Sequence, residues 1–495
     1  VYGNHRGRFN EYKRTVSDKN YGPLISTVMT RCIHCTRCVR FSTEIAGVSE
    51  MGSTGRGNTM EIGTYIDKTI HSELSGNMID VCPVGAITSK PYAFAARPWE
   101  LESIESIDIF DGIGSNIRVD VRGRDIMRIL PKQNKHINED WISDKIRFCY
   151  DGFKNQRIET PMLYLKKWNM LSTVNWTSAL DDIAEKINEK NNIQFVVGNS
   201  VDGETLHLVK KLSNQTGNSN IYTMNPQLSP DLRRNYIFDS NIDEIFKTEG
   251  VILIGTNLKT EAPMLNARLR KIQRKNNIKV YSIASSLNLA IDHKHIGNSI
   301  NSFIDVIRGN NSICKEIVKM KSISLVVGSS IIHSNDLRLV SLAISYLKQI
   351  INVSVNVLQP SSNSVTASDL GYPSLKHNST LYNQYSSSPK NNSNNVYYYV
   401  NTNNLPIEDI SDDSYVIYQG HHGYKLSSRH ADVILPGTSF LEKQGLYTNT
   451  EGRLQETKIV LDKLNNSIQD WKIIQGVAQW LNYKSDYPNS TITNI

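Results

Sequence analysis

The sequence predicts an α/β protein in three parts: a cysteine-bearing segment, a small β-rich domain and a large doubly wound α/β domain. Four of the six cysteines fall within the first 82 residues. Apolar and polar residues then alternate with period two, which is typical of half-buried strands. Further on, short apolar runs that end in glycine alternate with helical spacing, which indicates a parallel sheet covered on both faces. The three parts are expected at residues 1–100, 101–157 and 158–495.

The cysteines of the first part have the spacing of a metal centre. Cys32, Cys35 and Cys38 form a C-x2-C-x2-C triplet, and Cys82 is followed by Pro83. Three thiolates at this spacing can hold three corners of an iron–sulfur cubane, and a distant Cys-Pro can close the fourth. Zinc is the alternative, although zinc prefers paired C-x2-C units. The sequence therefore predicts one [4Fe–4S] cluster with these four cysteines as iron ligands.

Residues close to the triplet are candidates for tuning such a cluster. Arg37 lies inside the triplet, and Gly55 and Gly57 lie in a glycine-rich stretch. Positive charge and backbone N–H groups near the sulfurs set a cluster's reduction potential. The alternative is that the arginines of this region solvate a surface or pair with the nearby glutamates, which are Glu44, Glu50 and Glu61.

The second part is expected to be a small antiparallel sheet that holds no cluster. Its period-two runs are Ile104–Ile109, Ile117–Val121 and Ile126–Ile129, separated by Gly112–Gly114 and Gly123. Turn residues between alternating runs favour hairpins. The part contains a single cysteine, Cys149, and isolated cysteines such as Cys149 and Cys314 are expected to be buried hydrophobes.

The third part begins at about residue 158. Asn175 is a suitable N-cap for a helix that starts at Trp176. Helical spacing occurs in Trp176–Ile187, Gly203–Leu212, Glu261–Arg274 and Asn335–Gln349. Strand-like runs are Ile193–Gly198, Val251–Gly255, Ile278–Ile283, Ser324–Gly328, Val353–Val357, Tyr397–Val400, Tyr415–Tyr418 and Asp432–Leu435. Because crossovers between parallel strands are right-handed, a doubly wound sheet is expected. The Ser/Asn/Tyr-rich stretch 374–396 is expected to be a surface loop.

Composition narrows the class of function. The formal net charge of +7 comes from 55 basic and 48 acidic residues. This mild excess favours acidic partner surfaces, and no basic stretch is interleaved with aromatics as a single-strand nucleic-acid binder requires. No apolar run of about 18 residues occurs, so no membrane span and no signal peptide are expected. Sparse cysteine indicates a reducing compartment, and the abundance of Asn, Ile, Lys, Ser and Tyr fits an AT-rich genome such as an organellar one.

Several stretches together resemble one known family. They are Thr27–Phe41, Gly55–Asn58, Glu61–Tyr65, Ser72–Asn77, Asp80–Ala86, Ser89–Phe94, Ala96–Glu100, Gly114–Asn116, Met127–Pro131, Ile137–Lys145, Tyr150–Gly152, Ala431–Gly437 and Tyr447–Arg453. The sequence in these stretches is similar to the 75 kDa-type iron–sulfur subunit of NADH:ubiquinone oxidoreductase, respiratory complex I. The match is dense over the first 160 residues and scattered afterwards.

The resemblance implies an electron-transfer subunit of mitochondrial complex I. Such a chain relays single electrons through its [4Fe–4S] cluster from NADH and flavin toward ubiquinone, with no substrate site of its own. Carried over to this sequence, the ligands are Cys32, Cys35, Cys38 and Cys82. The first part would be ferredoxin-like, and the third part resembles molybdopterin oxidoreductases. The pterin site is generally unused in this family, so no molybdopterin is expected.

The resemblance also implies partners and a location. The family has an N-terminal ferredoxin-like domain with two further clusters, whose motifs do not occur in this sequence. A separate chain that carries those clusters is therefore expected, with a truncated sequence as the alternative. Flavoprotein and other subunits of the peripheral arm are further expected partners. The expected location is the matrix side of the mitochondrial inner membrane, with no nucleic acid and no direct membrane span.

Two rival functions remain open at this point. A molybdopterin-dependent oxidoreductase, such as a formate dehydrogenase, would need a cluster motif in 101–157 and a Cys or Ser ligand to the metal. A structural scaffold with a vestigial cluster is the other rival, and the presence of all four cysteines argues against it. His421 and His422 follow a predicted strand; they could bind metal, take up protons or line an empty cleft.

Overall fold

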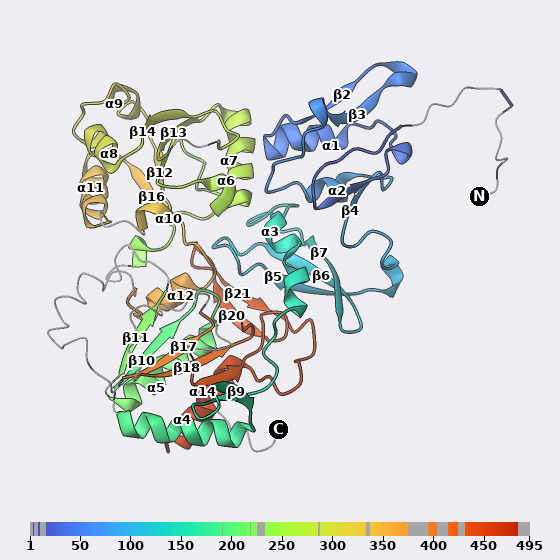
Figure 1. The fold of residues 1–495 in the computed structure, drawn as a ribbon. Helices are drawn as coiled ribbons and strands as arrows, with labels where there is room; N and C mark the ends of the chain where they lie inside the picture. The colour runs from blue at the N-terminus through green and yellow to red at the C-terminus, as the bar shows by residue number, and fades with distance from the viewer. Residues whose placement is uncertain are drawn as a thin grey trace. The chain divides into compact units, whose positions relative to one another are not determined.

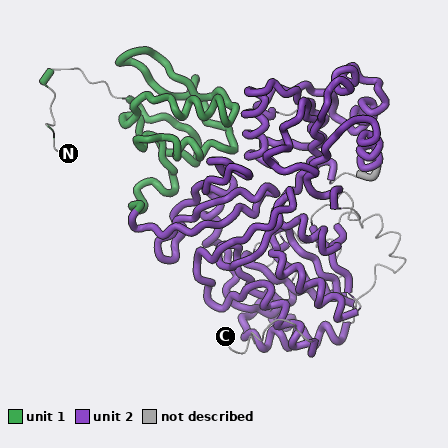
Figure 2. The backbone as a smooth tube through the Cα atoms, turned by 180° about the vertical axis from the view of Figure 1, so that it is seen from behind, with its two compact units in different colours: residues 1–98 green, residues 99–495 purple. Residues whose placement is uncertain are grey.

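The structure is a computed structural model of the 495-residue chain (Figure 1). It describes residues 16–190, 192–217, 219–224, 233–285, 288–332, 337–374, 395–402, 414–423 and 431–483, together with Gly3, Arg8 and Phe9. The chain divides into two compact units, residues 1–98 and residues 99–495 (Figure 2). None of the helices in the described residues is long and apolar enough to cross a bilayer.

Unit 1 is built from short elements around a small core. Its strands form two antiparallel pairs, β1 (Ile25–Thr27) with β4 (Ile87–Ser89) and β2 (Met51–Thr54) with β3 (Glu61–Thr64). Its helices are α1 (Arg37–Arg40), which continues into a π-helical segment (Phe41–Ala46), and α2 (Asn77–Val81). Its buried core includes Tyr21, Met29, Phe41, Ile62 and Met78. Because so small a unit buries little apolar surface, a bound metal centre would supply a large share of its stability.

Unit 2 begins with the antiparallel sheet that the alternating residues predict. Its strands are β5 (Glu102–Ile107), β6 (Asn116–Arg122) and β7 (Asp125–Pro131), followed by α3 (Asp144–Arg147). The apolar face of this sheet shares one core with distant residues, namely Phe440, Leu441, Tyr447, Val460 and Leu461. This shared core explains why the small sheet and the large α/β part form a single compact unit.

The first large sheet has the strand order β11-β10-β17-β18-β19-β8-β9, parallel from β11 to β19 and antiparallel at β8 and β9. Its strands are β8 (Met162–Leu165), β9 (Met170–Thr173), β10 (Asn192–Val197), β11 (Ser219–Thr223), β17 (Asn395–Val400), β18 (Tyr415–Gly420) and β19 (Val433–Pro436). Three helices share an apolar core with it (Figure 1): α4 (Trp176–Lys190), α5 (Gly203–Thr216) and α14 (Asp470–Trp480).

The second large sheet is wholly parallel, in the order β14-β13-β12-β15-β16. Its strands are β12 (Gly250–Ile254), β13 (Lys279–Ile283), β14 (Lys294–Gly297), β15 (Ile323–Val327) and β16 (Val353–Val357). One face is covered by α6 (Leu258–Glu261) and α7 (Pro263–Asn276), and the other by α8 (Ile300–Ile307) and α11 (Leu337–Ile350) (Figure 1). Within β12, Val251 and Leu253 face the first pair, and Ile252 and Ile254 face the second. Burial on both faces is the reason that this strand is a continuous apolar run.

The remaining elements are short. Among the described residues, the remaining α-helices and strands are α9 (Cys314–Ile317), α10 (Ser329–Ile332), α12 (Ser364–Asp369), β20 (Gly445–Thr448) and β21 (Leu454–Thr457), and 3-10 helices such as Met29–Arg31 and Cys149–Lys154 lie between the longer elements. The strands β20 and β21 form an antiparallel pair.

The α/β class predicted from the sequence is confirmed, with corrections in detail. The parallel strands belong to two sheets rather than one, because β10 pairs with β17 and β12 pairs with β13 and β15. The predicted loop 374–396 ends too late, since Asn395 and Val396 already belong to β17, and most of its remainder lies outside the described residues. The predicted helix start at Asn335 also lies outside them, and α11 begins at Leu337.

Candidate iron–sulfur site

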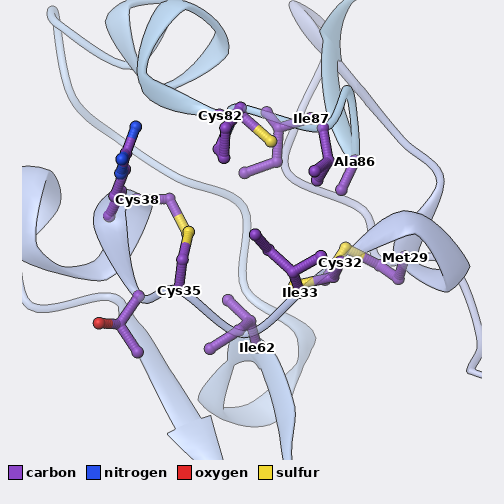
Figure 3. Close-up of a pocket in the computed structure, with 13 residues that line it drawn as sticks. Met29, Cys32, Ile33, Cys35, Cys38, Ile62, Cys82, Ala86 and Ile87 are labelled. Carbon is purple, nitrogen blue, oxygen red and sulfur yellow. The ribbon is translucent and has the colours of Figure 1, made fainter.

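Four cysteines from two separate stretches of unit 1 line one pocket (Figure 3). They are Cys32 and Cys35 in the loop before α1, Cys38 in α1, and Cys82 at the end of α2. None of them forms a disulfide. The β1–β4 pair joins the two stretches, and Val28 N donates to Ala86 O at 2.9 Å just beyond it. The fold therefore brings the three-plus-one set of the sequence motif to one place.

The loop that carries Cys32 and Cys35 turns sharply at two residues that are not glycine. His34 and Thr36 have φ angles of 54° and 58°. L-residues enter this left-handed region at a cost of about 1–2 kcal/mol, and such strain is concentrated at functional sites. The turn lets His34 N donate to Cys32 Sγ at 3.4 Å. An N–H aimed at a sulfur stabilises negative charge there and tunes the potential of a bound cluster.

Apolar side chains form most of the remaining lining of the pocket. They are Met29, Ile33, Ile62, Pro83, Val84, Ala86 and Ile87. Ile62, from β3, is 1% exposed, whereas Ile33 is 59% exposed. The pocket therefore has a dry inner wall and a rim at the protein surface. A wall of this kind keeps water away from a metal centre and controls its potential.

The pKa of Cys38 shows that the thiols act on one another. Burial, opposed by the N–H of Val39 and assisted by the charges of Cys32, Cys82 and Cys35, raises the Cys38 pKa to about 11. Thiolates gathered in an apolar pocket need a positive partner, and a coordinated metal deprotonates thiols. The pocket therefore has the chemistry of a metal–thiolate centre.

A buried tyrosine behind the pocket was missed by sequence reasoning. Tyr21 is 2% exposed, and its hydroxyl donates to Ile62 O at 3.4 Å. Burial, and then the charges of Cys38 and Cys32, raise the pKa of Tyr21. The ring therefore supports the β3 wall as a neutral group. A single tyrosine outside any motif carries no signal in the sequence.

The number and spacing of the four thiols bear on the choice between zinc and a cluster. Within the described part of the chain, no three His, Cys, Asp or Glu side chains converge where a single metal ion would bind. Zinc requires four ligands within about 2.0–2.3 Å of one centre. A cubane instead takes one thiolate at each of four separate iron corners. The three-plus-one spacing of the four cysteines in the sequence suits the second arrangement.

The three predicted tuning residues do not all lie at the pocket. Arg37 lines the pocket, whereas Gly55 and Gly57 are not among its lining residues. A Cβ on Gly55 would lie 2.4 Å from Thr59 O, so the turn between β2 and β3 accounts for that glycine. The tuning role of Arg37 stays a prediction, and the two glycines gain no support for theirs. Glu61 pairs with Lys19 at 3.3 Å.

The two adjacent histidines lie after β18 in unit 2. Their rings meet edge to face with centroids 4.7 Å apart, and His421 Nδ1 contacts His422 Nδ1. Arg157 Nε donates to His421 O at 3.1 Å, and His422 Nε2 lies 3.2 Å from Gly152 O. Burial lowers the pKa of both rings, that of His421 strongly. The two histidines, with neutral rings, therefore connect residues 152–157 to the end of β18 through hydrogen bonds.

A buried ion network occupies the carboxyl edge of the first large sheet. Lys443 Nζ pairs with Asp470 Oδ2 at 2.6 Å and with Asp202 Oδ1, and none of these side chains is more than 3% exposed. Asn401 and Gln419, at the ends of β17 and β18, each donate to the Asp470 carboxylate at 3.0 Å. Open α/β sheets bind ligands at this edge. In this chain, the charged groups at that edge form ion pairs with one another.

Three family models match the chain. The NADH-quinone oxidoreductase subunit 3 ferredoxin-like domain matches residues 22–88. The NDSU1/NuoG-like 4Fe-4S domain of NADH-ubiquinone oxidoreductase matches residues 101–151, and the molybdopterin oxidoreductase family matches residues 157–479. The fold and the cysteine pocket thus define an iron–sulfur protein whose large part has the molybdopterin-oxidoreductase fold.

Curated relatives identify the family more closely. The NADH-ubiquinone oxidoreductase 75 kDa subunit of Reclinomonas americana is 45% identical, over 98% of this chain and 73% of that protein. The mitochondrial 78 kDa subunit of Candida albicans is 42% identical, over 98% of this chain and 68% of that protein. The chain belongs to this family of 75 kDa-type subunits of NADH-ubiquinone oxidoreductase, and the resemblance seen in its motifs is confirmed.

One solved structure shows only a distant likeness. The formyltransferase/hydrolase complex from Methylorubrum extorquens matches with a TM-score of 0.45 and 11% identity, over 63% of this chain and 97% of that chain. A likeness at this level says nothing about function.

Two groups that the family models imply do not fit the residues present. Residues 101–151 contain a single cysteine, Cys149, which packs against the core of the small sheet, whereas a four-iron cluster needs four ligands. The other cysteine of unit 2, Cys314, lies in α9 and donates to Val306 O at 3.2 Å. Neither cysteine lies at the carboxyl edge of the first sheet. The charged groups at that edge, Lys443, Asp202 and Asp470, are already paired with one another. That edge therefore does not fit a molybdenum–pterin group.

Proposed function

We propose that Cys32, Cys35, Cys38 and Cys82 hold one [4Fe–4S] cluster, through which the chain relays single electrons within respiratory complex I. The electrons would pass from NADH and flavin toward ubiquinone. The observation that carries this proposal is the position of four thiols around one dry pocket. The names of the relatives, which are subunits of NADH-ubiquinone oxidoreductase, support the assignment to that complex.

The chain's own residues position the centre and take no part in bond chemistry. When bound, a four-iron cluster supplies one-electron oxidation and reduction. The strained loop at His34 and Thr36 presents the thiols, and the His34 N–H lowers the charge density on Cys32 Sγ. Ile62 closes the inner wall against water. Ile33 and Val84 leave the outer rim at the surface, where a partner's redox centre can approach.

The proposal includes partners and a location. The partners are other subunits of the peripheral arm, among them the flavoprotein subunits. The location is the matrix side of the mitochondrial inner membrane. Relatives named as mitochondrial support the organelle.

A ligand substitution in the assembled complex tests the electron path. Cys35→Ser should lower NADH-to-ubiquinone activity to the background level, because a missing corner ligand breaks the chain of electron transfers. Iron content and reduced-state EPR are measured on the same complex. The matched control is Cys314→Ser, which removes a thiol of unit 2 and should leave activity and iron unchanged. Full activity in the assembled Cys35→Ser complex would refute the proposed path.

A further inference from the structure

The hairpin between β5 and β6 places three polar side chains on one face. Ile107 pairs with Asn116 in the antiparallel ladder, and Asp108 N donates to Ser115 O at 2.8 Å, which extends the pairing by one residue. Residues directly opposite each other share a face, and so do residues two apart on one strand. Ser106, Asp108 and Ser115 therefore project from the same side of the hairpin.

Four oxygen atoms of this hairpin are buried without a hydrogen-bond partner among the described residues. They are Ser106 Oγ, Asp108 Oδ2, Asp111 Oδ2 and Ser115 Oγ. The four side chains are between 0% and 5% exposed. Buried polar atoms are nearly always paired, and each exception requires an explanation such as an ion. Four exceptions within ten residues point to a ligand that the chain itself does not supply.

The loop of the hairpin holds Asp111 in place. Asp111 Oδ1 accepts from Ile113 N at 3.0 Å and from Gly114 N at 3.2 Å, which leaves Oδ2 as the second, unused oxygen. Residues distant in the sequence donate to backbone oxygens of the loop: Ser362, Asn449, Thr450 and Gln455. A Cβ on Gly112 would lie 2.2 Å from Gln359 O. The loop is thus held tightly on both sides, and the Asp111 side chain is 5% exposed.

The charges around the hairpin do not balance. Asp108 and Asp111 are close enough that the charge of Asp111 acts on Asp108. Lys145 acts on both carboxyls, but its Nζ donates to Phe110 O at 2.7 Å. Cys149 is also nearby, since burial and then the charge of Asp108 raise the pKa of that thiol to about 12. Burial raises the pKa of both carboxyl groups, so holding them ionised in an apolar core requires a positive charge beside them.

We propose that Asp108 and Asp111 bind one hard divalent cation of the Mg²⁺ or Ca²⁺ class, with the hydroxyls of Ser106 and Ser115 as further ligands. Oxygen donors select such cations, whereas thiolate and imidazole select zinc, copper and iron–sulfur centres. Two carboxylates also match the charge of a divalent ion. Residues 101–151, which match a 4Fe-4S family model, would then hold a single ion in place of a cluster. This inference does not depend on the proposed electron path.

Binding of Mn²⁺ to the purified full chain tests the site, because Mn²⁺ shares the preference for oxygen ligands and free Mn²⁺ is counted by EPR. The wild type should bind one Mn²⁺ per chain in competition with Mg²⁺ or Ca²⁺. Asp108→Asn and Asp111→Asn should each weaken binding by more than about tenfold, since the loss of even an outer partner of a metal site typically costs that much. A wild type that binds no Mn²⁺ would overturn the proposal.

Two further variants make the result decisive. Asp125→Asn removes an exposed carboxylate of the same small sheet, which pairs with Lys154 at 2.5 Å, and should leave Mn²⁺ binding unchanged. If Asp125→Asn and Asp111→Asn weakened Mn²⁺ binding equally, the effect would come from surface charge, and the proposed site would be contradicted. Ser115→Ala keeps both carboxylates and decides the question if the aspartate variants do not fold. It should bind Mn²⁺ several-fold more weakly and gain less thermal stability from it than the wild type; unchanged binding contradicts the site.

Discussion

The cysteine pocket of unit 1 and the Lys443 network of unit 2 are opposite solutions to the burial of reactive groups. In the pocket, four thiols face one another within an apolar wall and require a partner from outside the chain. In the network, one ammonium group lies between two carboxylates, and amide groups of the neighbouring strands complete the hydrogen bonds. The pocket is therefore arranged for a cofactor, whereas the charges and hydrogen-bonding groups of the network are paired with one another.

The comparison teaches that position in a fold does not decide function. The carboxyl edge of an open α/β sheet is the usual place for a ligand, yet in this chain the ligand-requiring chemistry lies in the small unit of short elements. Whether the buried polar groups have hydrogen-bond partners within the chain is the better guide to a ligand site. By the same criterion the β5–β6 hairpin resembles the pocket, because its buried oxygens are unpartnered.

The largest stability effect is expected at the network. Lys443→Met leaves Asp202 and Asp470 buried without their cation and should lower the unfolding free energy of unit 2 by about 3–5 kcal/mol, as breaking a buried ion pair does. Denaturant unfolding followed by a probe in unit 2 measures it. The control Lys186→Met removes a surface pair with Glu189 and should cost less than about 1 kcal/mol. Equal effects of the two substitutions would contradict the structural role of the network, and iron bound in unit 1 should be unchanged in both.

A smaller effect is expected at the wall of the pocket. Ile62→Ala removes a fully buried side chain and should cost about 2–5 kcal/mol, the range for large-to-small core changes, while iron is lost faster in air. Ile33→Ala changes an exposed isoleucine of the same pocket and should stay within about 0.5 kcal/mol. Thermal unfolding and the rate of iron release give the two readouts. If the two variants released iron at the same rate, the distinction between dry wall and open rim would be wrong.

The smallest effect concerns protons at His421. Burial, then His422, Arg157 and Lys443, lower the pKa of His421 in the folded chain, so the unfolded chain binds a proton that the folded chain excludes. The contribution of His421 to the free energy of unfolding is therefore fully present above pH 6.5, the ordinary histidine pKa. It is lost as the pH falls, by about 1.4 kcal/mol at one pH unit below that value. His421→Asn should reduce the loss of unit 2 stability between pH 7.5 and 5.5, whereas the surface variant His207→Asn should follow the wild type. An unchanged pH dependence in His421→Asn would refute this assignment.

The sequence predicted the pocket better than it predicted the network. The triplet identifies three pocket cysteines within seven residues, and Cys82, which is followed by Pro83, is a recognisable fourth. The rest of the wall could not be predicted, because Tyr21 and Ile62 belong to no motif and His34 and Thr36 enter a left-handed region that sequence patterns assign to glycine. The tuning role of Gly55 stays a prediction, and the β2–β3 turn is a sufficient reason for a glycine at that position.

Long-range pairing limited the prediction of unit 2. Apolar runs such as β10 and β12 look alike in the sequence, and nothing in them says that β10 pairs with β17 while β12 pairs with β15. The network depends on that pairing, because its three charged residues come from three distant stretches. The division of the chain into 1–100, 101–157 and 158–495 stays a prediction.

Iron content and low-temperature EPR of the reduced, purified chain test the central claim most directly. The account predicts about four irons per chain and one signal of a cubane cluster, since four cysteines, the number that one cubane needs, line the pocket. Both should disappear in Cys82→Ala and persist in Cys314→Ala. Zinc in place of iron, or a cubane signal that survives in Cys82→Ala, would contradict the account.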